Sequence, residues 1–245
     1  MTACSRPEAP ALTVSVAASL QDAMGQLGPA FEQSHPGARL SFNFGGSGML
    51  AQQIEHGAPA DVFLAAASKP MDELAAHGLL WNDTRRDLLQ NQIVLIAPTA
   101  DTAMNSFAGL AASSVKLIAL GEPGSVPAGD YGRQVLESMR LSGTLTLWQA
   151  LQGKLVLAKD VRQVLTYVET GNADAGIVYA TDVRQSQGIR IAAIAPESTH
   201  TPVVYPVAVL KDSRNSSAAR AFVSFLEGPQ AGAAFRRLGF TTVTP

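Results

Sequence analysis

The stretch Leu12-Thr-Val-Ser-Val-Ala-Ala-Ser-Leu-Gln-Asp22 decides the fold of this chain. Its first half, residues 12–17, is rich in β-branched and apolar residues, which is typical of a buried strand. Ser19 follows at once, and an acid stands three residues later at Asp22, a pattern that begins helices. Apolar residues then recur at helical spacing as far as Phe31. The stretch therefore predicts a strand that turns sharply into a helix.

The pattern of an apolar strand followed by a helix recurs along the chain. Apolar strands alternate with longer amphipathic segments, a pattern that favours an α/β protein with mostly parallel sheets flanked by helices. The expected strands lie near residues 12–17, 39–44, 61–65, 92–97, 115–120, 153–158, 175–178, 189–194 and 203–210. No repeat or flexible linker interrupts this order.

Two apolar, β-rich segments are expected to join two lobes. They are residues 91–98 and 201–208, and both have proline nearby. If the chain crosses at the first and returns at the second, the first lobe holds residues 12–92 plus 206–245, and the second holds 93–205. Two such lobes would form a cleft at the carboxyl ends of their strands, where open parallel sheets bind ligands.

Composition excludes several classes of function. The 245 residues are 47% hydrophobic and 16% charged, with a net charge of −2. This balance is typical of a packed globular protein and lacks the basic footprint of nucleic-acid binding. Lysine and arginine are scattered, which argues against a polybasic membrane patch. No apolar run is long enough to cross a bilayer.

Residues 1–11 are expected to form a disordered N-terminal tail without the apolar centre of a signal peptide. Cys4 is the only cysteine, so no internal disulfide exists. Its context, Thr-Ala-Cys-Ser before a Pro/Ala stretch, resembles the end of a bacterial lipoprotein signal. Two interpretations stay open, namely a lipid anchor at Cys4 and an incidental cysteine in a tail.

Four short stretches place a hydroxyl or a backbone N–H at the first turn of a helix. They are residues 18–20, 45–49, 126–129 and 159–162. A helix start has unpaired N–H donors and partial positive charge, so it suits an oxyanion. Four of them in one chain indicate a protein that binds a small anion.

The glycine-rich stretch 45–48 could belong to three kinds of enzyme, and each fails on a residue. A phosphate-binding loop needs Gly-Lys-Ser/Thr, but Met49 follows Gly48. A dinucleotide fingerprint needs a different glycine spacing, and a hydrolase elbow needs glycine at position 49. A tight turn with a capping serine at Ser47 remains the alternative to anion binding. We find no nucleophile–base pair, so the chain is expected not to be an enzyme.

Tyr179 stands at the end of the expected strand 175–178, a position from which a side chain points into a cleft. A core tyrosine whose hydroxyl bonds to backbone is the other interpretation. Tyr131, Tyr167 and Tyr205 lack that placement.

A resemblance runs along nearly the whole chain. Its motifs occur in the same order in the periplasmic molybdate-binding proteins of ABC transporters. They are Val16-Ala-Ala-Ser-Leu20, Gly57-Ala-Pro-Ala-Asp-Val-Phe63, Val126-Pro-Ala-Gly-Asp-Tyr131, Asp160-Val-Arg162, Gly176-Ile-Val-Tyr179, Tyr205-Pro-Val-Ala-Val209 and Gly228-Pro-Gln-Ala231. Val-Pro-Ala-Gly in particular is specific to that group. One departure is that glycines flank Ser47, where some relatives carry further serines.

The resemblance implies a two-lobed type II periplasmic-binding-protein fold with a hinge of two crossing strands. It implies capture of molybdate, and of tungstate, by uncharged donors between the lobes; a binding protein for sulfate or another tetrahedral oxyanion is the alternative. The implied ligand-binding residues are Ser19, Ser47, Ala128, Val161 and Tyr179. Molybdenum would enter only as the oxyanion, without protein–metal ligands or a cofactor. The implied setting is a periplasmic monomer that delivers molybdate to the membrane permease of an ABC importer.

Overall fold

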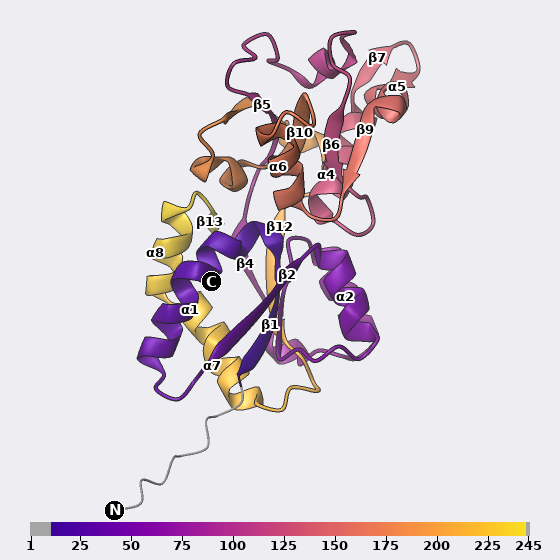
Figure 1. The fold of residues 1–245 in the computed structure, drawn as a ribbon. Coiled ribbons are helices and arrows are strands. Elements are labelled where there is room, and N and C mark those ends of the chain that lie inside the picture. The colour runs from indigo at the N-terminus through magenta and orange to yellow at the C-terminus, as the bar shows by residue number, and fades with distance from the viewer. Residues whose placement is uncertain (1–10, 244–245) are drawn as a thin grey trace, which may run out of the picture.

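Two β-sheets organise the chain, one with six strands and one with five, and each forms the centre of a lobe (Figure 1). The structure is a computed structural model that describes residues 11–243. The predicted tail, apart from residue 11, lies outside the described residues, and so does Cys4, for which a lipid anchor is one of the two interpretations.

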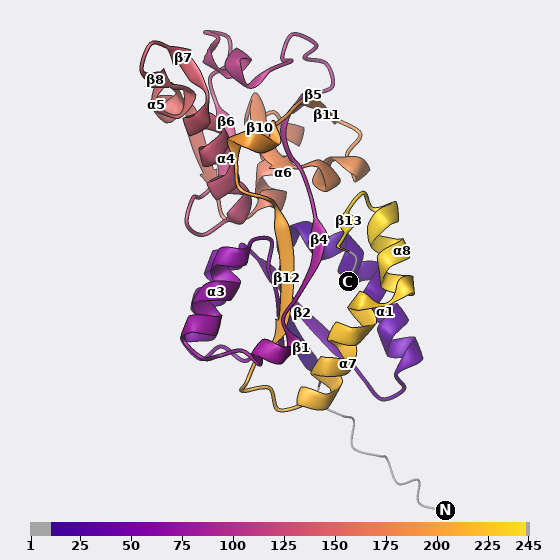
Figure 2. The same ribbon diagram turned by 180° about the vertical axis from the view of Figure 1, so that it is seen from behind.

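The first lobe contains a sheet with the strand order β13-β4-β12-β3-β1-β2. Its strands are β1 (Leu12–Ala17), β2 (Leu40–Gly45), β3 (Val62–Leu64), β4 (Arg86–Gln90), β12 (Val204–Val209) and β13 (Thr241–Thr242). Its helices are α1 (Gln21–Ser34), α2 (Ser47–Glu55), α3 (Ser68–Ala76), α7 (Ser216–Glu227) and α8 (Pro229–Arg237). Helices α1, α7 and α8 cover one face of the sheet, and α2 and α3 cover the other (Figures 1 and 2). Strand β1 pairs with β2 and β3 and has helices on both faces, so five of its six residues are buried, the polar Ser15 among them.

The second lobe contains a sheet with the strand order β11-β5-β10-β6-β9. Its strands are β5 (Ile93–Pro98), β6 (Ile118–Gly121), β9 (Leu155–Ala158), β10 (Ala175–Tyr179) and β11 (Ile189–Ile194), with a small hairpin of β7 (Arg140–Ser142) and β8 (Leu145–Thr146). Its helices are α4 (Pro127–Ser138), α5 (Leu147–Leu151) and α6 (Val161–Glu169). Six short 3₁₀ turns complete the described elements: Ala18–Leu20, Asn82–Thr84, Phe107–Ala111, Gln152–Lys154, Ala180–Gln185 and Glu197–Thr199.

Small residues let α4 and α6 pack closely on opposite faces of this second sheet. A Cβ at Gly176 of β10 would lie 2.9 Å from Val164 of α6, so the helix sits directly on the strand there. A Cβ at Gly132 of α4 would in turn lie 3.1 Å from Ile177. Because successive residues of a strand point to opposite faces, the two helices sandwich β10.

The sheets are mixed rather than mostly parallel, which corrects one expectation. Strands β2, β1 and β3 are parallel, as are β9, β6 and β10, but β12 runs against β3 and β5 runs against β10. The chain leaves the first lobe after β4 and returns to it at β12, and these two strands are antiparallel. A chain that leaves a lobe and comes back must run in both directions, so the crossing strands cannot all be parallel to the rest. The predicted lobe limits at 92/93 and 205/206 stay predictions about which residues move together.

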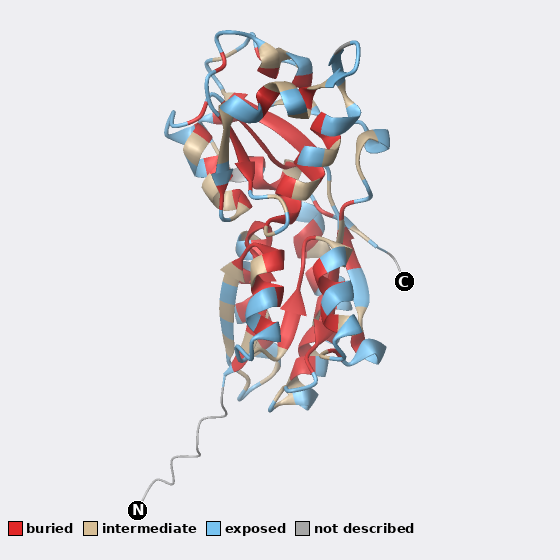
Figure 3. Ribbon diagram, turned by 90° about the vertical axis from the view of Figure 1, so that its right-hand side faces the viewer, coloured by how far each residue is buried: buried red, intermediate tan, exposed pale blue. Residues whose placement is uncertain are grey.

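The buried apolar residues of both lobes form one cluster that continues across the crossing strands. A smaller cluster lies under α2 and α3. Figure 3 shows the buried residues inside each lobe and where the lobes meet. Among residues 11–243, no helix combines the length and the apolar character that a membrane span requires.

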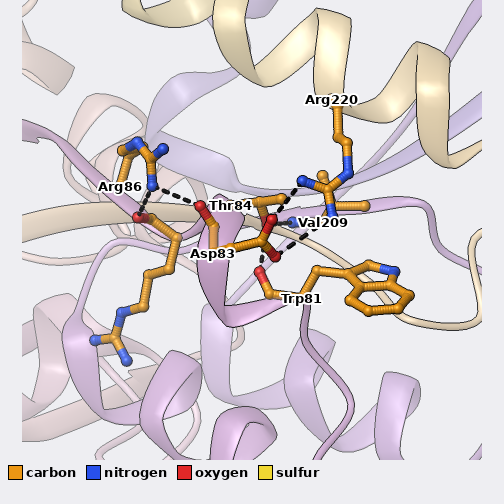
Figure 4. Close-up of polar contacts among 7 residues, drawn as sticks. Trp81, Asp83, Thr84, Arg86, Val209 and Arg220 are labelled. Atoms are coloured by element: carbon orange, nitrogen blue, oxygen red, sulfur yellow. Dashed lines mark hydrogen bonds and ion pairs between the residues drawn. The ribbon is translucent and has the colours of Figure 1, made fainter.

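A polar network holds α7 against the sheet of the first lobe, far from the second lobe (Figure 4). The hydroxyl of Thr84 donates to the carbonyl of Trp81 at 2.6 Å and accepts from the backbone N–H of Val209 at 2.9 Å. Arg220 of α7 pairs with Asp83 at 2.7 Å and lies over the Trp81 ring. These contacts tie α7 to the turn before β4, and this end of the lobe carries no part of the predicted site.

Candidate functional site

One small cavity between the lobes is walled by all five residues that the sequence predicted for ligand binding. These residues are Ser19, Ser47, Ala128, Val161 and Tyr179. Alanine, glycine, valine and proline make up the rest of the wall, so no charged residue of the described chain lines it. The cavity volume is about 10 Å³, so a bound ion would touch the wall on every side. The ligand-binding role of the five stays a prediction.

Parallel strands from both sheets bring these residues together. The wall residues follow the carboxyl ends of β1, β2 and β3 in the first lobe and of β6, β9 and β10 in the second. This is the edge of an open sheet at which ligands bind. The expected cleft is therefore confirmed, and it contains contributions from both lobes.

Three helices begin at the cavity. Ser47 is the first residue of α2, Ala128 is the second of α4 and Val161 is the first of α6. The N–H groups of a first turn have no partner within their own helix, and their end of the helix is partially positive. Asp160 caps α6 by accepting from the backbone N–H of Gln163 at 2.8 Å. The wall is therefore electropositive without a cationic side chain.

The two serines do not cap helices, which corrects the expectation for Ser19 and the alternative left open for Ser47. Ser19 lies in the 3₁₀ turn Ala18–Leu20, and its hydroxyl makes no cap bond. It lies 3.2 Å from the hydroxyl of Tyr205 instead. The Oγ of Ser47 accepts from the backbone N–H of Ala66 at 3.0 Å. Tertiary partners outside each local helix therefore hold both hydroxyls at the cavity.

Tyr179 reaches the cavity from β10 and contacts the opposite lobe. Its hydroxyl donates to the carbonyl of Ala66 at 3.4 Å, a long hydrogen bond. Burial raises the pKa of this phenol well above 10, because the charged form would be desolvated. Tyr179 therefore keeps its proton and stays neutral, and in this structure its one O–H is directed at the carbonyl of Ala66.

Asp182 lies fully buried behind the cavity. Its Oδ2 accepts from the backbone N–H of Tyr179 at 3.1 Å, whereas its Oδ1 is buried without a hydrogen-bond partner among the described residues. Burial raises the pKa of this carboxyl from 3.8 to about 7, against the lowering effects of the Tyr179 N–H and of Arg162. Asp182 fixes the backbone at Tyr179 and makes this region sensitive to pH.

Direct contacts hold the lobes together beside the cavity. The backbone N–H of Gly48 in α2 donates to the carbonyl of Ser125 in the second lobe at 3.0 Å. Arg162 of α6 pairs with Asp22 of α1 at 3.1 Å. These contacts describe a closed arrangement of the lobes.

Sequence reasoning missed three residues of the site. Ala66 serves both Ser47 and Tyr179 through its backbone, which leaves no mark in a side-chain pattern. Tyr205 was placed away from the cleft, but its hydroxyl contacts Ser19, which is 186 positions earlier in the chain. Asn91 donates to Tyr205 at 3.1 Å. Only the position of Asn91 and Tyr205 in the two predicted crossing segments could have drawn attention to them.

Comparison with known proteins places the chain in a family. The model of the family described as "Bacterial extracellular solute-binding protein" matches residues 12–241. The molybdate-binding protein ModA of Escherichia coli is 38% identical to this chain, and the alignment covers 94% of this chain and 88% of ModA. A Bacillus subtilis protein, YvgL, provisionally named an ABC transporter substrate-binding lipoprotein, is 42% identical over 94% of this chain and 86% of its own length.

A solved structure agrees with this placement. The periplasmic molybdate-binding protein of Azotobacter vinelandii superposes with a TM-score of 0.81 at 26% identity, over 94% of this chain and 98% of its own. These matches confirm both the two-lobed type II fold and the resemblance drawn from the motifs. The relatives are named for binding and transport. The chain belongs to the family of bacterial extracellular solute-binding proteins.

Proposed function

We propose that this protein is the substrate-binding component of an ABC importer and that it captures molybdate between its lobes. The observation that carries the proposal is the convergence of uncharged donors from both lobes on one small cavity. Ser19 and Ser47 come from the first lobe, and Ala128, Val161 and Tyr179 come from the second. An anion that touches both sets would stabilise the closed form by differential contacts.

Hydrogen bonds and helix ends are sufficient to bind such a dianion. A hydrogen bond to a charged group contributes roughly 1.5–3 kcal/mol. Several such donors outweigh the costs of desolvating the anion and ordering the closed form, and leave a net affinity between about micromolar and nanomolar. The same donors suit tungstate, which has nearly the size and charge of molybdate.

A wall of donors also accounts for selectivity. Molybdate, tungstate and sulfate have no proton at neutral pH and accept hydrogen bonds on every side. Phosphate keeps a proton, which would need an acceptor, and an unpaired buried polar group is costly. Sulfate has shorter bonds, so it would leave the donors of a molybdate-sized wall stretched. A sulfate-binding protein is the second candidate function, because its ligand has the same charge and shape.

Titration calorimetry with four anions tests the proposal. At pH 7.5 we expect molybdate and tungstate to bind with similar affinity, sulfate to bind more weakly and phosphate most weakly. Sulfate ranking first would favour the second candidate. Phosphate bound as tightly as molybdate, or no heat with any of the four, would contradict the proposal.

Loss of one serine hydroxyl is expected to weaken molybdate binding by roughly 1–3 kcal/mol, because one donor to a charged group disappears. Ser19→Ala and Ser47→Ala should each show this loss in calorimetry. Ser34→Ala serves as the matched control, because Ser34 is exposed at the end of α1 and bonds only locally. Wild-type affinity in both site variants would remove the two hydroxyls from the binding set.

The proposal also includes the partner, the oligomeric state and the location of the protein. The partner would be the membrane permease of the transporter, and a monomer suits lobes that must close freely around the ligand. The family is extracellular by description, and we place the protein on the outer side of the inner membrane, in the periplasm. A lipid at Cys4 would tether it there; mass spectrometry of the native protein decides whether that cysteine is modified.

A further inference from the structure

A serine hydroxyl can donate one hydrogen bond and accept others, so a donor-only site must control where each serine proton points. Ser47 is controlled by the backbone. Its Oγ accepts from the N–H of Ala66, which can only donate, so the Ser47 proton remains free for the cavity. The equivalent control of Ser19 is less direct, because its partner Tyr205 is a hydroxyl that could serve in either direction.

Asn91 removes this ambiguity. Its Oδ1 accepts from the backbone N–H of Gln92 at 2.9 Å, which fixes the orientation of the amide. The Nδ2 group therefore faces the Oγ1 of Thr181 at 2.8 Å and the hydroxyl oxygen of Tyr205 at 3.1 Å. An amide nitrogen only donates, so Tyr205 accepts at this contact.

Tyr205 must then give its own proton to another atom. The hydroxyl oxygen of Ser19, at 3.2 Å, is the remaining partner of this fully buried phenol. Two buried side-chain oxygens of the described residues lack a partner, Oδ1 of Asp182 and Oγ of Ser186, and neither makes a hydrogen bond with Tyr205. The donation thus runs from Asn91 to Tyr205 and from Tyr205 to Ser19.

We propose that Asn91 and Tyr205 are positioning residues that hold Ser19 as a hydrogen-bond donor and thereby set the selectivity against protonated oxyanions. This inference rests on the proposed function. Tyr205 donates to one of the two lone pairs of Ser19, and the Ser19 proton, which has no other partner among the described residues, is left to the cavity. Molybdate accepts that proton, whereas a P–OH group that donated to Ser19 would leave the Ser19 proton without an acceptor.

The two positioning residues also lie at the places where the chain passes between the lobes. Asn91 stands between β4 and β5, and Tyr205 lies near the start of β12. Thr181, which receives the other Asn91 proton, belongs to the second lobe. The orientation of Ser19 is therefore tied to the crossing segments in the closed arrangement.

Tyr205→Phe tests the proposal directly. The variant keeps the ring and removes the donor that occupies Ser19. Its molybdate affinity should fall about tenfold, the equivalent of one hydrogen bond to a charged group. Phosphate affinity should stay unchanged or rise, since Ser19 is no longer held as a donor and can turn to accept, so the ratio of the two affinities should narrow by at least about tenfold. If Tyr205 had only a structural role, Tyr205→Phe would lower the affinities for molybdate and phosphate equally, and that result would overturn the proposal.

A double-mutant cycle with Ser19→Ala supplies the second readout. If Tyr205 acts through Ser19, adding Tyr205→Phe to Ser19→Ala should cause little further loss; equal losses in both backgrounds would overturn the proposal. Tyr131→Phe is the matched control, because its buried hydroxyl bonds to the carbonyl of Pro202 and is expected to leave the ratio unchanged. Should Tyr205→Phe fail to fold, Asn91→Ala must show the same narrowing and the same dependence on Ser19. Wild-type protein that binds no oxyanion would defeat the proposed function itself, which is a separate outcome.

Discussion

Gly48→Ala is expected to hold the two lobes apart and to weaken molybdate binding by roughly 10- to 100-fold. A Cβ at position 48 would lie 2.6 Å from the carbonyl oxygen of Gly124 and 2.9 Å from that of Ser125, both in the opposite lobe. Because these neighbours are backbone atoms and not the ends of flexible side chains, they cannot move aside without shifting the chain. Overpacking of this kind costs about 1–3 kcal/mol, and here the cost falls on the closed form alone.

Small-angle scattering separates this effect from a lost ligand contact. Wild-type protein should become more compact when molybdate is added, whereas Gly48→Ala should stay extended at the same anion concentration. Gly25→Ala provides the matched control, because a Cβ at that helical position meets no atom within 4 Å. If Gly48→Ala closes and binds as the wild type does, the close approach at this glycine is not what limits closure.

Asp182→Asn is expected to stabilise the ligand-free protein above neutral pH by up to about 4 kcal/mol, at about 1.4 kcal/mol for each pKa unit. The pKa of Asp182 rises on folding from 3.8 to about 7, because burial disfavours the charged carboxylate. The folded protein then binds more protons than the unfolded chain, so its stability falls as the pH rises from about 4 to about 7. Asparagine cannot ionise, and its carbonyl can still accept from the N–H of Tyr179.

Urea unfolding at pH 4.5, 6 and 8 measures this linkage. The gap between Asp182→Asn and the wild type should be small at pH 4.5 and should widen to a constant value above pH 7. Asp83→Asn is the contrasting control, because the exposed Asp83 is hydrogen-bonded to Arg220, which lowers the pKa of Asp83. Parallel stability curves for Asp182→Asn and the wild type would show that the buried carboxyl does not titrate as inferred.

The sequence predicted the parallel strands and helix starts of the fold well, because these depend on local patterns. Residues 12–17 became β1 as expected, and α6 begins at Val161, within the predicted helix start at residues 159–162. Strand β4 was missed because its sequence, Arg-Asp-Leu-Leu-Gln, carries charged and exposed residues, and because it pairs with β12 and β13, which are far away in the sequence. The two-residue strand β13 is too short to leave a pattern.

The five residues that the resemblance named all line the cavity, but the residues that hold them in place were not predicted. The five wall residues lie at helix starts or strand ends, positions that motifs and hydrophobic patterns reveal. The role of Tyr205 depends on a contact with Ser19 between distant segments, and no local pattern reports which hydroxyl faces which. The same holds for Asp182, whose burial no local pattern of the sequence indicates.

The donors that we propose at Ala128 and Val161 are peptide groups at the beginnings of helices. Exchange of either side chain for another small apolar one leaves the N–H in place, and among the common amino acids only proline deletes it. Substitutions of this kind at the two positions should therefore change the affinity for the anion little, provided that the helix still begins there. The hydrogen-bond donors of the cavity therefore depend less on which side chains line its wall than on the positions at which the helices begin.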